Sequence, residues 1–88
     1  MTESAGESLG EVRGVLAEVS ERLRAAYRCV RSAEQGLDEA IAVLSRLDQS
    51  HHDNLVPPEL PRASSELTRG LGLISGGVES VEAIDARL

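Results

Sequence analysis

The chain has 88 residues and a formal net charge of -6, and its composition excludes several classes of function. Tyr27 is the single aromatic residue and all nine basic residues are arginines, so the positive surface and stacking rings that bind nucleic acids are missing. No apolar run approaches the roughly 18 residues of a membrane span, and the first residues lack the basic and apolar regions of a signal peptide. Cys29 is alone, which excludes an internal disulfide and a thiolate metal cluster. We therefore expect one small, acidic, cytoplasmic domain, with export without a cleavable signal peptide as the alternative.

Residues 1–8 are small and polar and predict a disordered tail. Ser8 and Glu11 match a capping box, in which a serine hydroxyl and a glutamate satisfy free amides at a helix start. From there, apolar residues recur every seven positions in two series three residues apart, without an intervening proline. The first series is Leu9, Leu16, Leu23, Val30, Leu37 and Leu44, and the second is Val12, Val19, Ala26, Ala33, Ala40 and Leu47. The pattern predicts a helix over about 8–48.

The next segment, about 49–57, predicts a loop. Its Asp, Asn and Ser residues and its adjacent prolines end one helix and start another. A second heptad series then predicts a helix over about 58–87, formed by Leu60, Leu67, Ile74, Val81 and Leu88. Four glycines between Gly70 and Gly77 weaken this helix, each by up to about 1 kcal/mol. They indicate either close packing or a break near Ser75–Gly77.

Together the two segments predict an all-α fold, an antiparallel two-helix hairpin that forms a single domain over 9–88. Pairing Leu47 with Leu60 places large residues opposite small ones along the seam, as close packing requires. In this register Val30 faces Gly77, so we expect Gly77→Leu to clash with Val30. A slip of one heptad is the main competing register.

A two-helix hairpin does not cover all of the apolar surface in these helices. The first helix extends past the second, and a further apolar strip flanks the seam, so we expect a partner that completes a four-helix bundle. The expected partner-interface residues are Leu9, Val12, Val15, Leu16, Tyr27, Ile41 and Val43. The partner is a second copy, giving a homodimer, or a larger helical protein. The alternative is a frayed N-terminus with scattered surface valines.

Few residues suggest chemistry. His51 and His52, with Asp48 and Asp53, form the only metal-capable cluster, but too few ligands are present and we expect a solvated turn rather than a metal or small-ligand carrier. Cys29 resembles a buried small hydrophobe more than a redox residue. A hairpin also has no cleft for a substrate. We therefore expect no enzymatic activity, no catalytic residue, no cofactor and no small-molecule substrate.

Three arginines, Arg24, Arg28 and Arg31, share one outer helical face and form a candidate patch for an anion or an acidic partner. The simpler interpretation is a solvated face. Glu18 with Arg22, and Glu21 with Arg24, have the spacing of ordinary helical ion pairs.

The stretch LSRLDQSHHDNLVPPELPRASSELTRGLGLI, residues 44–74, resembles the centre of small helical-hairpin proteins from actinobacteria. Such hairpins occur alone or as N-terminal regions of polymorphic toxins. The layout is more distantly similar to WXG100 (ESAT-6-like) hairpins, although Trp-x-Gly is absent from the joint and the C-terminus lacks a Tyr-x-x-x-Asp/Glu signal. The resemblance implies a non-catalytic adaptor that dimerises or docks on a larger effector assembly. The alternative is a WXG100-like protein associated with type VII secretion or with a polymorphic toxin.

Overall fold

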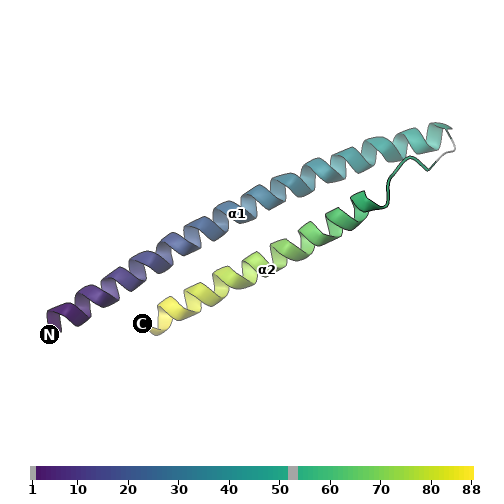
Figure 1. Ribbon diagram of the computed structural model, residues 1–88. Helices are drawn as coiled ribbons and strands as arrows, with labels where there is room; N and C mark the ends of the chain where they lie inside the picture. Colours follow the sequence, from purple (N-terminus) through teal and green to yellow (C-terminus); the bar gives the residue numbers. More distant parts are fainter. Residues whose placement is uncertain (1, 52–53) are drawn as a thin grey trace.

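The computed structural model describes residues 2–51 and 54–88, and the side chains of residues 8–50 and 54–88. Within these ranges the chain forms two α-helices, α1 (Thr2–His51) and α2 (Glu59–Arg87). The helices run antiparallel beside each other, and α1 extends beyond the C-terminal end of α2 (Figure 1). The molecule is a rod with extents of 75 × 15 × 15 Å. The predicted all-α hairpin is therefore confirmed.

The helix boundaries differ from the expected ones mainly at the N-terminus. Helix α1 begins at Thr2, so residues 2–8 belong to it and the expected capping box at Ser8 and Glu11 lies inside the helix. The physical reason is that no proline interrupts the chain before His51, so helical hydrogen bonding continues through this segment.

Helix α2 begins where the prolines predicted a start. Pro58 occupies the N-cap with φ -64° and ψ -19°, and Pro61 lies in the first turn, where a missing N–H costs nothing. The Leu60 N–H donates to the Pro57 carbonyl at 3.1 Å, which tightens this turn. The helix then runs unbroken through the four glycines to Arg87. No break occurs near Ser75–Gly77.

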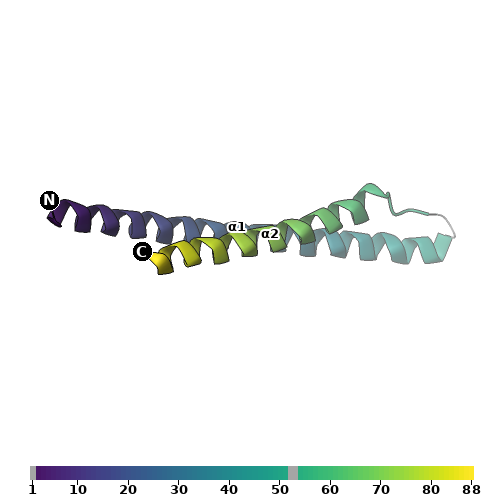
Figure 2. The same ribbon diagram turned by 90° about the horizontal axis from the view of Figure 1, so that it is seen from below.

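The seam between the helices follows a regular heptad rhythm. Its members are half-buried or buried and are spaced alternately by four and three residues. On α1 they are Leu16, Ser20, Leu23, Tyr27, Val30, Glu34, Leu37, Ile41 and Leu44; on α2 they are Leu60, Ser64, Leu67, Leu71, Ile74, Val78 and Val81. The helices cross at a shallow angle, as expected from a seven-residue repeat on a 3.6-residue helix (Figure 2).

The register of this seam differs from the expected one. Asp38 accepts a hydrogen bond from Ser64 at 2.7 Å, and a Cβ added at Gly77 would lie 4.0 Å from Leu23 rather than against Val30. Leu47, expected opposite Leu60, remains 43% exposed. The predicted pairing was therefore wrong by more than one helical turn. The Leu heptad series of α1 does lie in the seam. The second row of the seam on α1 is formed by the residues four positions after that series, not three; they are Ser20, Tyr27, Glu34 and Ile41.

The hairpin has a very small core. Among the described side chains, Leu71 at 6% exposure is the only buried hydrophobic one, and it shares the interior with the buried polar residues Ser20 and Glu34. The chain exposes 6567 Å². A compact monomer of its 9.4 kDa mass exposes about 5,000 Å². The hairpin therefore leaves an excess of surface on the order of 1,500 Å² in contact with solvent.

Candidate protein-interaction face

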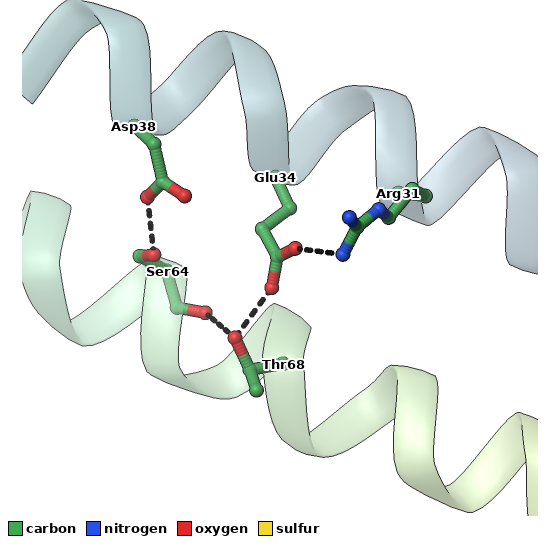
Figure 3. Close-up of polar contacts among 5 residues, drawn as sticks. All are labelled: Arg31, Glu34, Asp38, Ser64 and Thr68. Carbon is green, nitrogen blue, oxygen red and sulfur yellow. Dashed lines mark hydrogen bonds and ion pairs between the residues drawn. The ribbon is translucent and has the colours of Figure 1, made fainter.

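One side of the hairpin is held by polar contacts between the helices. Figure 3 shows Arg31, Glu34 and Asp38 of α1 reaching toward Ser64 and Thr68 of α2. Glu34 is only 8% exposed. Its carboxylate accepts hydrogen bonds from the Thr68 hydroxyl and, at 3.3 Å, from Arg31. A buried carboxylate needs such partners because an unpaired one is costly to desolvate.

These contacts fix the alignment of the two helices. The Thr68 hydroxyl lies within reach of both Glu34 and, at 3.1 Å, the Ser64 carbonyl, and with one proton it donates to one of them at a time. Further along the rod, Arg24 donates to Glu82 at 2.6 Å. Sliding one helix by a turn would break the Thr68–Glu34 and Arg24–Glu82 contacts together, because both join the two helices. We name this the polar side of the hairpin.

The opposite side of the hairpin is apolar along most of α1 and around the middle of α2, whereas Glu59, Glu66 and Arg87 share the heptad position of Leu73 toward the ends of α2. In an antiparallel pair, the residues just before the end of each four-residue step of the seam, such as Val19 before Ser20 on α1 and Gly70 before Leu71 on α2, lie on the same side of both helices. On α1 this flank and its neighbours are Val12, Val15, Val19, Ala26, Cys29, Ala33, Gly36, Ala40, Val43 and Leu47; on α2 they are Ala63, Gly70, Leu73, Gly77 and Ile84. We name this set the apolar face.

The large residues of the apolar face are open to solvent. Val15 is 58% exposed and Leu73 is 70% exposed, and Val12, Val19, Val43, Leu47 and Ile84 expose between 36% and 47%. Single exposed hydrophobic residues are ordinary on protein surfaces, but a continuous strip along two helices is typical of an interface. The face carries the second heptad series of α1, which the hairpin does not use.

The expected partner residues divide between three places. Val12, Val15 and Val43 lie on the apolar face, and Leu9 is half-buried near the end where α1 extends past α2. Leu16, Tyr27 and Ile41 belong to the seam of the hairpin. Tyr27 and Ile41, expected beside the seam, lie in it because the second row of the seam on α1 follows the Leu series by four residues; their contact with a partner stays a prediction.

Tyr27 also lines an open groove of about 380 Å³ on the polar side. The other residues around this groove are Arg24, Arg28, Ser75, Val78 and Glu79. The expected arginine patch therefore borders a groove rather than a free positive surface. Arg24 pairs with both Glu21 and Glu82, and Arg31 pairs with Glu34. Acidic residues of the same hairpin thus neutralise two of the three arginines.

The other candidate residues show little organisation. Asp48 accepts a hydrogen bond from the Leu55 N–H and so closes the helix end, while His52 and Asp53 lie outside the described residues. The described part of the chain contains no cluster of three metal-capable side chains. Cys29 is exposed, on the apolar face beside the seam.

Sequence reasoning missed part of the apolar face. Ala26, Ala33, Ala40 and Leu47 were assigned to the hairpin seam, and Leu73 was not singled out, although it is the most exposed of the large hydrophobic side chains. One signal in the sequence was available. Besides the two heptad series, α1 carries apolar residues at Val15, Cys29 and Val43, which is more than a two-helix seam uses and is typical of four-helix bundles.

None of the described helices has a segment that is long and apolar enough to span a membrane.

Comparisons with known proteins give no further guide to this face. No protein-family model, curated protein or solved structure matches the chain.

Proposed function

We propose that this protein is a non-catalytic interaction module that binds another helical surface through its apolar face. The observation that carries the proposal is the contrast between the seam and the apolar face of the hairpin. Among the described hydrophobic side chains the seam buries one, Leu71 at 6% exposure, whereas the apolar face leaves seven large side chains at least 36% exposed. A small domain with so little core gains stability by associating.

The geometry of the face supports a helical partner. The face runs along a rod 75 Å long and 15 Å wide, which suits one or two partner helices lying along it. Its middle consists of small residues such as Ala26, Ala33, Gly36 and Gly70, which allow a neighbouring helix to approach closely. An apolar strip beside the seam of each helix is the pattern that completes a four-helix bundle.

The role that follows is assembly. A rod of this length presents an interface along one side and leaves its polar side, with Arg24, Asp38 and Glu82, in contact with solvent. Such a module joins chains into a bundle or docks on a larger effector assembly as an adaptor. The chemistry of the complex then belongs to whatever is joined.

The decisive experiment compares two neighbouring substitutions. Ala33→Arg places a charge in the middle of the apolar face, whereas Ser32→Arg places the same charge on the outer side of α1. We expect analytical ultracentrifugation to give a mass above that of one chain for the natural protein and for Ser32→Arg. For Ala33→Arg we expect the mass of one chain, because a buried unpaired charge opposes association.

The contrary result is equally clear. A natural chain that is a stably folded monomer at all concentrations tested, with the same unfolding midpoint as Ala33→Arg, would show that the apolar face needs no partner. Circular dichroism on the same samples separates failure to associate from failure to fold.

A further inference from the structure

We propose that the apolar face is occupied by a second copy of this chain, related by a two-fold axis that packs α1 against α1 and α2 against α2, both antiparallel. This inference rests on the proposed function and names its partner. The loops of the two hairpins then lie at opposite ends of a four-helix bundle, and the axis passes near Cys29 and Leu73.

The first observation concerns where the middle of the face lies. On α1 the outermost large residues of the face, Val12 and Leu47, lie about equally far from Cys29, and on α2 Gly70 and Gly77 flank Leu73. The hairpin brings these two centres to the same level, because Leu23 lies beside Gly77 on one side of them and Glu34 bonds Thr68 on the other. One two-fold axis can therefore pass through both centres.

The second observation concerns the sizes of the side chains. Large residues lie at both ends of the α1 part, Val12, Val15 and Val19 at one end and Val43 and Leu47 at the other. Rotation about the proposed axis places the large residues at one end of the face on α1 opposite the large residues at the other end of the face on α1 of the second copy, to within about one helical turn. Large residues thus meet large ones, and the small residues meet in the middle, where α1 approaches its copy closely.

The third observation concerns charge. Glu59 and Arg87 are exposed at the heptad position of Leu73, fourteen residues before it and fourteen residues after it. The axis brings Glu59 of one copy to the level of Arg87 of the second copy, and by symmetry this pair of opposite charges occurs twice. Charged residues at the rim of an interface select orientation more than they add affinity.

The competing dimer has both loops at the same end and packs α1 against α2 of the second copy. The register of the hairpin then places Val43 opposite Glu59, and Val15 opposite Arg87, of the second copy. Gly36 faces Glu66 in the same way. Charges would press against apolar residues along the length of this interface. The antiparallel arrangement instead brings Val15 to Val43 and Glu59 to Arg87 of the second copy. It sets one charge of α1, Arg22, opposite Gly36, against the three such contacts of the competing dimer, and for this reason we prefer it.

The exposed area is sufficient for such a dimer. A stable interface of standard size buries about 800 Å² on each partner. The excess over a compact monomer, on the order of 1,500 Å², is larger than this. The apolar face alone includes ten residues of α1 and five of α2, along most of the hairpin.

Charge exchange at Leu73 tests the axis. Leu73→Glu and Leu73→Lys each place two like charges near the axis of a homodimer, so we expect the dissociation constant of each to rise roughly 100-fold. An equimolar mixture of the two variants should recover a dimer, since unlike charges then meet. Ser65→Glu and Ser65→Lys, on an exposed position of α2 outside the face, serve as matched controls and should leave the dimer unchanged.

Crosslinking tests the orientation. In a Cys29→Ser background, chains carrying Val15→Cys are mixed with chains carrying Val43→Cys and treated with a short bismaleimide. We expect a covalent heterodimer, because the axis brings these positions together. A mixture of Val43→Cys and Glu59→Cys chains should give no crosslinked dimer, although the competing arrangement predicts one.

The outcomes separate this inference from the proposed function. A dimer that crosslinks only through Val43→Cys and Glu59→Cys, or that the Leu73 pair fails to restore, overturns the antiparallel axis and leaves the interaction module standing. A natural chain that remains a folded monomer throughout overturns both. Recovery of the Leu73 mixture together with the Val15–Val43 crosslink supports the inference.

Discussion

Leu71 and Leu73 are two residues apart on α2 and are chemically identical, yet they have opposite environments. Leu71 is 6% exposed and faces α1, whereas Leu73 is 70% exposed and lies on the apolar face. The difference arises from helix geometry, because two residues along a helix correspond to a rotation of about 200°. The comparison shows that the hairpin divides one hydrophobic pattern into two parts, one for folding the chain and one left for association. Each prediction below tests this division, in order of decreasing effect.

The largest effect is expected from truncating the buried leucine. Leu71→Ala should lower the free energy of unfolding by about 2–4 kcal/mol, because it removes the best-buried hydrophobic side chain and leaves a cavity. Leu73→Ala should leave the unfolding of the dilute hairpin within about 0.5 kcal/mol of the natural chain and should weaken only association. Urea denaturation at several chain concentrations measures both effects. Equal losses in the dilute chain would contradict the division.

A smaller loss is expected from the polar side. Thr68→Val keeps the shape of the side chain but removes the hydroxyl that donates to Glu34, and should cost about 1–2 kcal/mol. The double variant Glu34→Leu with Thr68→Val should cost less than the sum of the single variants, because no buried carboxylate is left unpartnered. Thermal unfolding of the four chains of this cycle gives the coupling. Additive losses would mean that this hydrogen bond contributes nothing to the seam.

The glycines of α2 provide a finer test. A Cβ at Gly72 would meet nothing within 4 Å, so Gly72→Ala should stabilise the helix by about 0.5–1 kcal/mol. Gly77→Ala should give a similar gain in the dilute chain, since its nearest neighbour is Leu23 at 4.0 Å. Because Gly77 lies on the apolar face, the same change should weaken association, and Gly72→Ala should not. Sedimentation and thermal melts distinguish the two variants.

The smallest effect is expected from the surface ion pair between the helices. Arg24 and Glu82 are bonded at 2.6 Å, but their side chains are 46% and 54% exposed. Glu82→Gln should therefore cost less than about 0.5 kcal/mol, and the cost should decrease as salt is added. Glu79→Gln, at an exposed position without a described ion pair, is the matched control. A loss above 1 kcal/mol in thermal melts would show that this contact, and not the buried seam, fixes the register.

The sequence was sufficient to predict the hairpin, because strict heptads and a proline-rich joint leave few alternatives. It was not sufficient to predict that the residues four positions after each member of the Leu series, rather than those three positions after it, complete the seam on α1. Ala26, Ala33 and Ala40 look like better seam residues than Ser20 and Glu34, since buried polar groups are usually unfavourable. Glu34 is accepted in the seam because Thr68 and Arg31 satisfy its carboxylate, and this partnership depends on the relative position of the helices.

The sequence likewise predicted only part of the candidate interface. Val12, Val15 and Val43 were identified from unpaired apolar positions, which is a local property of α1. Leu73 and the small residues became part of one face only when the register of α2 was known. Tyr27 was misplaced by the same error, since an aromatic residue beside an expected seam of alanines looks like a contact for another chain.

The position of Tyr27 has a practical consequence. It is the only aromatic residue of the chain, and it is half-buried where Val78 and Ser75 of α2 approach it, on the side away from the apolar face. Its ultraviolet absorption and fluorescence should therefore change when the helices separate and remain constant when chains assemble. The native protein thus carries an intrinsic optical probe of hairpin opening, which lets spectroscopy follow folding while light scattering follows assembly in the same sample.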